Sequence, residues 1–392
     1  MRKAWLTLVV LTLARTAMGF QFESMGALSP LLVQNLGISY AAVGMLVGLY
    51  LLPGVVVALP VGLFAQGYGD KLVTCIGLCG MVAGGLLTAA SESVAVLMAG
   101  RLISGAGAVA MNVLASKMVA DEFQSGRRGT ALGILVTGWP LGIALALVSL
   151  PRFAGAFSCS AAMFGTASLN LFALLLVLGC CPNAARGGAV RPRHRSFDLT
   201  GREFILSTTA GLLWTLYNFA FVAVLSFGPT FLVASGMKVE SANAVVSATS
   251  WVAIPAAPLG AWLAQRTNCP SGMIMTCLLL ASVAISCVAH WGGSWAWFVA
   301  IGLLFGPPGG LIMTLPTEVV APQRGAVAMG VFFTCYYAGL GILPAVAGYL
   351  RDLSHSAASP LWFAVLLLLF ATLSLIAFRV FQSRRRCIRA EG

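Results

Sequence analysis

The chain has 392 residues, of which 59% are hydrophobic and only 9% are charged. A soluble domain has about 25% charged residues, and a water-soluble core of this length could not bury so much apolar surface. The formal net charge of +12 does not indicate nucleic-acid binding, because the basic residues cluster at the ends of apolar runs and form no basic soluble face. Composition therefore predicts an integral membrane protein embedded in a lipid bilayer.

A helix that spans a bilayer needs about 20 mostly apolar residues. The chain contains twelve such runs, which predict an all-α membrane protein. In chain order the expected spans are 4–32, 41–65, 72–91, 94–120, 128–150, 160–182, 204–234, 242–264, 271–291, 294–318, 325–350 and 359–381. The one long polar connection is 183–203. We expect an N-terminal six-helix bundle in 1–182, a central loop in 183–203, and a C-terminal six-helix bundle with a short basic tail in 204–392.

The basic residues also predict an orientation. With the N-terminus in the cytoplasm, the inside segments hold 17 Lys and Arg residues and the outside segments hold 3. Cytoplasmic loops of membrane proteins carry an excess of Lys and Arg. Both termini and the central loop are therefore expected in the cytoplasm, with the chain crossing the plasma or inner membrane an even number of times.

The sequence gives no sign of a metal, a cofactor or a disulfide framework. None of the ten cysteines forms a CxxC pair, and no histidine lies near one at metal-ligand spacing. Most of the cysteines lie inside apolar runs, where a free cysteine behaves as a small hydrophobic residue. The chain also lacks a GxxxxGK[ST] loop, so we do not expect it to hydrolyse a nucleotide.

The two halves of the chain resemble each other at an offset near 200 residues. LASKMVA at 114–120 matches LPTEVVA at 315–321, and the same offset of 201 places Gly105 on Gly306. Parallel repeats of six helices imply a pseudo-two-fold axis along the membrane normal. A solute site is then expected near mid-membrane, at the interface between the repeats.

Two segments resemble signatures of the major facilitator superfamily. GLFAQGYGDK at 62–71 is similar to its loop between the second and third helices, and GRLISGAGAVA at 100–110 is similar to its fourth-helix signature. LAQR at 263–266 resembles the second-half copy of the loop signature. The resemblance covers essentially the whole chain and implies a twelve-helix secondary transporter, which we expect to work as a monomer.

This resemblance also implies a cytoplasmic gate. In the loop signature Gln66 replaces the usual acid, and the second-half copy has glutamine at the same place. We expect two other ion pairs to substitute, Asp70 with Lys117 and Glu318 with Arg266. The expected gate residues are Gly62, Gly69, Asp70, Lys71, Lys117, Arg266 and Glu318.

Three charged residues stand out for their depth inside expected spans, where charge is costly and often functional. Arg15 lies about 16 Å into the first span at 1.5 Å per residue, near mid-membrane. Its guanidinium suits a carboxylate or a small oxyanion. Glu23 and Arg101 are expected at similar depth in two different helices. Glu23 is interpreted either as a proton-coupling carboxylate or as a permanent buried partner of Arg101, and the residues leave both open.

The second half contributes aromatic and amide side chains at comparable depth. Trp214, Tyr217 and Phe221 are spaced i, i+3 and i+7, on one helical face. The residues expected to bind the solute are Arg15, Trp214, Tyr217, Asn218 and Tyr336. The alternative is that these rings only pack against neighbouring helices or sit in an interfacial belt.

The sequence thus predicts proton-coupled transport of a small anionic solute, with the cyanate- and nitrite-like permeases as the most similar branch. The alternative within the fold is drug or metabolite efflux by antiport, since the glycines at 129, 133, 138 and 142 partly resemble an antiporter signature. A polytopic enzyme would need a nucleophile, an acid–base pair or a metal cluster, and a sensor would need a signalling domain. Neither is evident, so we do not expect an enzyme.

Overall fold

The computed structural model describes residues 2–123, 125–182, 199–321 and 324–390. All regular secondary structure in these ranges is helical. The helices are α1 (Arg2–Ala27), α2 (Ser29–Leu36), α3 (Tyr40–Gly48), α4 (Gly54–Tyr68), α5 (Asp70–Ala89), α6 (Val94–Glu122), α7 (Ser125–Ala156), α8 (Cys159–Cys180), α9 (Gly201–Ala234), α10 (Val239–Thr267), α11 (Pro270–Trp291), α12 (Trp295–Val319), α13 (Gly325–Ser354) and α14 (Ser359–Ala390). Eleven helices among the described residues are long and apolar enough to cross a membrane.

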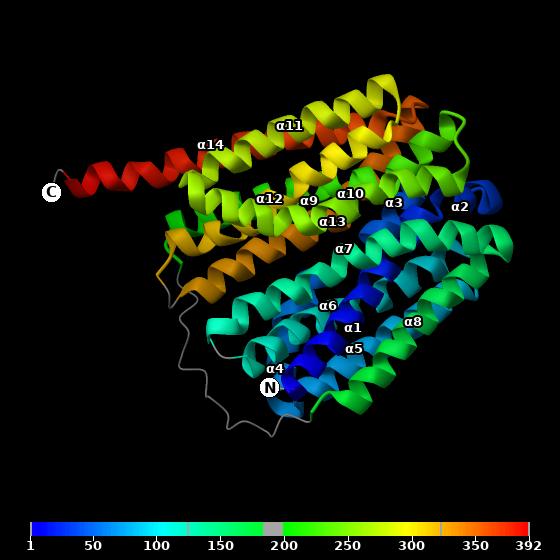
Figure 1. Ribbon diagram of the computed structural model, residues 1–392, viewed down its shortest axis with the longest axis horizontal. Helices are drawn as coiled ribbons and strands as arrows, with labels where there is room; N and C mark the ends of the chain where they lie inside the picture. Colours follow the sequence, from blue (N-terminus) through cyan, green and yellow to red (C-terminus); the bar gives the residue numbers. More distant parts are fainter. Residues whose placement is uncertain (1, 124, 183–198, 322–323, 391–392) are drawn as a thin grey trace.

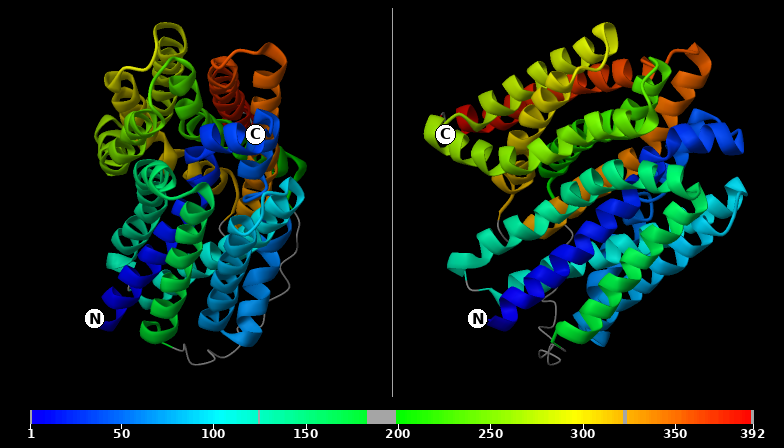
Figure 2. Two further views of the ribbon diagram at one scale, coloured as in Figure 1. Left: turned by 90° about the vertical axis from the view of Figure 1, so that its right-hand side faces the viewer. Right: turned by 45° about the vertical axis from the view of Figure 1, so that its right-hand side comes forward.

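The helices form two bundles. Helices α1 and α4–α8 pack mainly against one another in the first bundle, and α9–α14 do so in the second, while α3 lies mainly against α13 across the two bundles. Figure 1 shows the first bundle in blue to green below the second in green to red, with both chain ends at the same end of the molecule. Figure 2 shows the same two bundles from two further directions. The expected pair of six-helix bundles is confirmed, whereas the boundaries of the central loop stay a prediction because 183–198 lie outside the described residues.

The expected span 41–65 is wrong as a single helix. The chain forms α3, then a run of turns over residues 49–53, and then α4. Proline has no backbone N–H, so Pro53 cannot continue the α3 hydrogen-bond ladder. Hydrogen bonds that span three residues instead of four occur in this segment, from Leu51 N to Gly48 O at 2.9 Å and from Gly54 N to Leu51 O at 2.9 Å. Helices α3 and α4 together form one crossing, the second in chain order, and with it the first bundle has six.

The expected span 4–32 is also divided. Helix α1 ends at Ala27, and α2 starts at Ser29 with a proline in its first turn. The Ser29 hydroxyl donates to Gly26 O at 2.7 Å and stabilises the corner. Helix α2 packs against α9 of the second bundle. The chain between α1 and α3 therefore contributes to the contact between the bundles.

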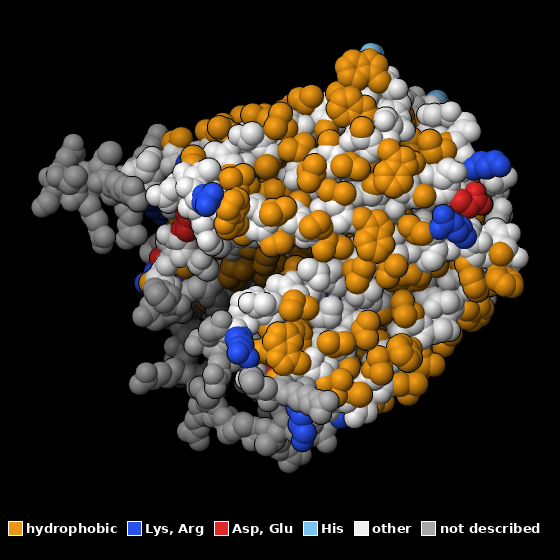
Figure 3. Space-filling view, in the orientation of Figure 1, with side chains coloured by type: hydrophobic (Ala, Val, Ile, Leu, Met, Phe, Trp, Pro, Cys, Tyr) orange, Lys and Arg blue, Asp and Glu red, His pale blue; other side chains and the backbone are white. Residues whose placement is uncertain are grey.

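The outer surface of the helices is apolar. Val56 is 72% exposed and Leu63 is 65% exposed, which would be unfavourable in water and is expected of side chains that face lipid. In Figure 3 apolar side chains cover most of the visible flank, and the charged ones gather toward its two ends. This distribution fits a protein that crosses a membrane along the long direction of its helices.

The bundles are in close contact at the end away from the chain termini. At Gly44 an added Cβ atom would overlap the Pro344 backbone, and at Gly348 it would overlap the Tyr40 backbone. These glycines bring α3 and α13 into direct backbone contact. Nearer the termini, the surface in Figure 3 is hollowed between the two bundles. The structure is therefore closed at one end and open toward the other.

Candidate functional site

A cavity of about 330 Å³, called here the central cavity, lies between the two bundles. Helices α1, α6 and α7 supply one wall, and α9, α10, α12 and α13 supply the other. Its polar and aromatic lining residues include Arg15, Asn112, Ser116, Trp139, Trp214, Tyr217, Asn218, Phe305, Phe333, Tyr336 and Tyr337. A second cavity of about 420 Å³ between α4, α6 and α13 shares Asn112, Ser116, Met313, Phe333 and Tyr337 with it. Among the described lining residues of both cavities, Arg15 alone is charged.

Arg15 lies midway along α1 and is half-buried. Helix α7 passes close behind it, since a Cβ atom at Gly138 would lie 3.2 Å from Arg15 Cβ. Tyr336 and Tyr337 of the second bundle are near enough to interact with its charge. The Arg15 Nε atom is buried and has no hydrogen-bond partner. Arg15 is therefore a positively charged residue in the lining of the central cavity, with its Nε atom enclosed by protein.

The second bundle forms an aromatic wall. The rings of Trp214 and Tyr217 stack with their centroids 5.5 Å apart, and Tyr217 lies 5.2 Å from Phe305. The Tyr217 hydroxyl donates to the Phe305 carbonyl oxygen and joins α9 to α12. Tyr336 lies 6.1 Å from Trp214. The five residues expected to bind the solute all line this one cavity, and their role in binding stays a prediction.

The two asparagine side chains that line the central cavity differ in their hydrogen-bond partners. Asn218 Nδ2 donates to the Trp214 carbonyl oxygen at 2.8 Å, within its own helix. The Asn112 side chain is hydrogen-bonded with Tyr337 of α13, and its Oδ1 atom is buried without a partner. Asn112 and Tyr337 are not among the residues that the sequence predicted to bind the solute. Asn112 could have been noticed as a single amide side chain within the apolar run of α6. The sequence alone does not show which face of the helix packs against the second bundle.

Arg101 does not form the buried ion pair with Glu23 that the sequence left open. Its side chain is 1% exposed and donates three hydrogen bonds to backbone carbonyls: Nε to Leu46 O at 2.8 Å, Nη1 to Gln21 O at 2.8 Å, and Nη2 to Phe22 O at 2.9 Å. The guanidinium also lies over the Tyr50 ring, 4.4 Å from its centroid. Because all its partners belong to the first bundle, Arg101 holds α1, α3 and α6 together beside the 49–53 break.

Glu23 instead contacts the second bundle. The residue is fully buried on α1, and Ser226 of α9 donates to its Oε1 atom at 3.3 Å. The Oε2 atom is buried with no hydrogen-bond partner. Gly26, one turn later, packs against the Ser226 backbone, where an added Cβ atom would come within 2.8 Å of Ser226 Cα. A carboxyl group thus lies in the contact between α1 and α9.

The expected gate residues of the first bundle interact among the bundle's own helices. Lys117 Nζ and Asp70 Oδ2 are 2.5 Å apart, which forms the expected ion pair between α6 and α5. Lys71 Nζ donates to Leu178 O at 2.8 Å and joins α5 to the end of α8. Gly69, with φ of 92°, supplies the sharp turn into α5. Gly62 faces open space, with no atom within 4 Å of an added Cβ.

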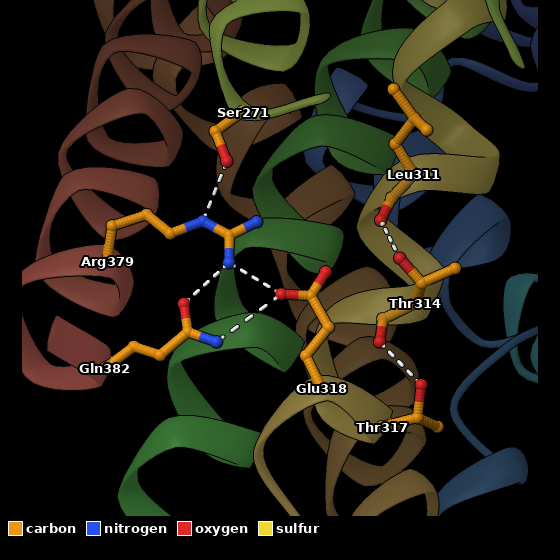
Figure 4. Close-up of polar contacts among 7 residues, drawn as sticks. All are labelled: Ser271, Leu311, Thr314, Thr317, Glu318, Arg379 and Gln382. Carbon is orange, nitrogen blue, oxygen red and sulfur yellow. Dashed lines mark hydrogen bonds and ion pairs between the residues drawn. The ribbon is translucent and has the colours of Figure 1, made fainter. Parts of the chain in front are cut away.

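In the second bundle the expected pair of Glu318 with Arg266 is wrong. Glu318 Oε2 accepts from Arg379 Nη1 of α14 at 2.6 Å, and Arg379 Nε donates to Ser271 Oγ of α11 at 2.7 Å (Figure 4). Gln382 also accepts from Arg379, at 2.6 Å. Arg266 lies on the Trp262 ring of its own helix, 4.6 Å from the centroid. The Arg379 cluster ties the end of α12 to α11 and α14.

Comparison with known proteins agrees with this architecture. The sequence model of the Major Facilitator Superfamily matches residues 5–344. The chain is 24% identical over 330 residues to the inner membrane transport protein YajR of Escherichia coli K12, covering 81% of this chain and 71% of that protein. It is 25% identical over 325 residues to the 4-hydroxybenzoate transporter PcaK of Pseudomonas aeruginosa, covering 74% and 72%.

Solved structures show the same fold at lower identity. A bacterial homologue of the human lysosomal transporter Spinster, in an inward-facing and occupied conformation, superposes with a TM-score of 0.78 at 14% identity and covers 95% of this chain and 96% of its own. The nucleoside transporter NupG superposes with a TM-score of 0.76 at 14% identity, with coverage of 97% and 99%. The fold agrees with these comparisons.

Proposed function

Because the chain belongs to the major facilitator superfamily, and is therefore a membrane transporter, we propose that its solute is a small organic anion. The observation behind this proposal is the composition of the central cavity. Arg15 is the one charged residue among its described lining residues, and its opposite wall consists of the rings of Trp214, Tyr217 and Tyr336. A planar guanidinium binds carboxylates in a bidentate manner, and aromatic walls suit an apolar or aromatic body.

The same lining favours an organic over an inorganic anion. Cyanate or nitrite would use Arg15 but would leave the aromatic wall without an apolar partner. The lining of the cavity therefore gives no support to the predicted similarity to the cyanate- and nitrite-like branch of the superfamily. The relative named for 4-hydroxybenzoate, an aromatic acid, is a precedent for the proposed class of solute.

We place the open end of the cavity in the cytoplasm. The second cavity extends the central one between α4 and α13, and it includes Met329 and Gly330 near the start of α13. The start of α13 lies at the end of the molecule that also bears both termini. The expected excess of 17 over 3 basic residues assigns that end to the inside. The structure then corresponds to an inward-facing state of alternating access.

We further propose that Glu23 couples proton movement to transport. A buried carboxylate is costly unless it is paired, and Glu23 has one hydroxyl donor and one oxygen without a partner. Protonation would convert one oxygen into a hydrogen-bond donor and change the contact between α1 and α9. Because that contact must part when the closed end opens, the protonation state of Glu23 can be linked to the conformational change.

The test is uptake by proteoliposomes with a panel of radiolabelled organic anions, with and without a pH gradient. Native protein is expected to take up at least one anion, Arg15→Ala to reduce this uptake by roughly 100-fold or more, and Arg15→Lys to retain part of it, since an ammonium keeps the charge but not the fork. Arg152→Ala removes an exposed arginine that belongs to no expected site and serves as the matched control. Undiminished uptake by Arg15→Ala would falsify the anchor assignment.

The same vesicles test the coupling and the competing function. Glu23→Gln is expected to remove the response to a pH gradient while leaving counterflow exchange of the anion intact. A native protein that never responds to the gradient would exclude proton coupling. Transport of lipophilic cations in place of anions would instead establish drug efflux, a result that the positive charge of Arg15 in the cavity argues against.

A further inference from the structure

We propose that the second cavity, between α4, α6 and α13, is an apolar subsite. The ligand is then an amphipathic carboxylic acid with its carboxylate at Arg15 and an alkyl tail between α4 and α13. This inference rests on the proposed transport of an organic anion and narrows the class of that anion. Its basis is the chemistry of the lining of the second cavity and the way this cavity joins the central one.

The second cavity exists because α4 and α13 diverge from a close contact. At Gly54, the first residue of α4, an added Cβ atom would overlap the Tyr337 ring of α13. About two turns nearer the start of α13, at Gly330, the only atom within 4 Å of an added Cβ is Leu59 Cδ2, at 3.9 Å. The Leu59 side chain is 62% exposed and lines the cavity. The cavity therefore has room for further apolar atoms between the two helices.

The polar side chains in this lining already have partners in the protein. The Thr334 hydroxyl donates to Gly330 O at 2.9 Å. The Ser116 hydroxyl donates to Asn112 O at 3.0 Å, and the Asn112 side chain is hydrogen-bonded with Tyr337. The rest of the lining consists of glycines and apolar side chains, including Val55, Ala58, Leu59, Val113 and Met329. Water in this cavity has few groups to bind, and an apolar group that displaces such water gains affinity.

The apolar cavity and the charged one can be occupied by a single molecule. They share five lining residues, and one of these, Tyr337, is near enough to Arg15 to interact with its charge. The central cavity, at about 330 Å³, lies at the lower end of the range for small-molecule sites, about 300–1,000 Å³. An acid bound at Arg15 therefore gains the room for an alkyl tail from the second cavity.

The experiment measures the binding of four acids to purified protein in nanodiscs by isothermal titration calorimetry. They are benzoate, 4-ethylbenzoate, 4-butylbenzoate and 4-hexylbenzoate. Native protein is expected to bind the butyl acid about tenfold or more tightly than benzoate, because each methylene that leaves water contributes a gain of roughly three- to fourfold. Partition of the acids into the lipid is the same for every variant, so the comparison between variants isolates the contribution of the cavity.

Two variants fill the second cavity from opposite walls. Gly330→Leu does so from α13 and Ala58→Leu from α4. Each should reduce the preference for the butyl acid by about fivefold or more, while binding of benzoate persists and shows that the variant is folded. Gly165→Leu is the matched control, because Gly165 of α8 has no atom within 4 Å of an added Cβ and lines neither cavity.

A preference for the butyl acid that is equal in the two filling variants and in Gly165→Leu would overturn the subsite but leave organic-anion transport standing. Binding of none of the four acids would overturn both proposals. Native mass spectrometry of the same proteins tests the other possible occupant. A phospholipid that Gly165→Leu retains and both filling variants lose would assign the second cavity to a membrane lipid, and so overturn its assignment to the tail of the solute.

Discussion

Asp352 of the second bundle caps a helix of the first. Its Oδ1 atom accepts from the backbone N–H of Tyr40 at 3.0 Å, and its Oδ2 atom accepts from the N–H of Ala41 at 2.8 Å. Both N–H groups belong to the first turn of α3, where no carbonyl within the helix can reach them. A negative charge is also favoured at this end of a helix. The closed end of the molecule is therefore joined by a helix cap that crosses the two bundles.

Replacing Asp352 with alanine is expected to favour opening of this end. Loss of an N-cap costs about 1 kcal/mol, which changes an equilibrium roughly fivefold. Spin labels on Ser93 and Ser356, in a background without exposed native cysteines, would report the separation of the bundles by double electron–electron resonance. A larger population of long distances is expected for Asp352→Ala. Glu240→Gln, a change of charge at the same end, is the control, and identical distributions for native protein and Asp352→Ala would disprove the role of the cap.

Arg351 strengthens the same contact from the neighbouring position. The side chain is 5% exposed, its guanidinium lies 3.6 Å from the centroid of the Tyr40 ring, and it donates to the Thr230 hydroxyl of α9. Lysine cannot stack flat on the ring or donate as a fork, so Arg351→Lys should favour opening in the same direction as Asp352→Ala. Because both residues act on the start of α3, the double variant should open less than the sum of the two single effects. Strictly additive effects in the same spin-label measurement would show that the two contacts are independent.

Arg101 is expected to matter for folding and not for solute recognition. Its removal would take away the hydrogen bonds that the guanidinium donates to three buried carbonyl oxygens of α1 and α3, each worth about 1.5–3 kcal/mol because the donor is charged. Arg101→Ala should therefore lower the thermal unfolding temperature in detergent by several degrees or prevent purification of folded protein. Arg266→Ala, which removes an exposed arginine, should leave it unchanged. An Arg101→Ala protein as heat-stable as the native one would contradict this account.

Two glycines from the family signatures should respond differently to the same substitution. A Cβ atom at Gly105 would overlap the Tyr50 carbonyl oxygen at the 49–53 break, whereas at Gly62 it would meet no atom within 4 Å. Gly105→Ala is expected to destabilise the protein by about 1–3 kcal/mol through overpacking. Gly62→Ala is expected to be neutral or slightly stabilising, since alanine is the better helix former. Unfolding temperatures measured side by side test the pair, and equal values would refute the packing argument.

Much of the fold could be predicted because the responsible signals are local. The apolar runs define the helices within a few residues, and the offset of 201 between LASKMVA and LPTEVVA indicates the repeat. The prediction failed at 41–65, where Pro53 interrupts the hydrogen-bond ladder between α3 and α4. A proline in an apolar run is compatible with either a kink or a break, and only the packing of α6 around Tyr50 distinguishes the two.

The choice of partners was harder to predict. Asp70 and Lys117 pair as expected, but Glu318 pairs with Arg379 and not with Arg266. Arg379 follows Glu318 by 61 positions in the sequence, so no helical spacing or loop length relates them. Arg101 likewise binds backbone carbonyls of α1 and α3 and not Glu23. The sequence could not predict these partners, because every residue has a backbone carbonyl and the residue pattern does not show which ones are accessible.

The sequence by itself determined that this is an integral membrane protein, that it consists of two repeated six-helix halves, and that Arg15 lies inside a helix at membrane depth. These properties follow from hydrophobicity and periodicity, which act along the chain. Only the tertiary structure decided that Arg15, Asn112 and Trp214 line one cavity, that Glu23 contacts Ser226, and that Asp352 closes the far end on Tyr40. Each of these relationships joins helices distant in sequence, and it depends on how those helices are rotated and packed against one another.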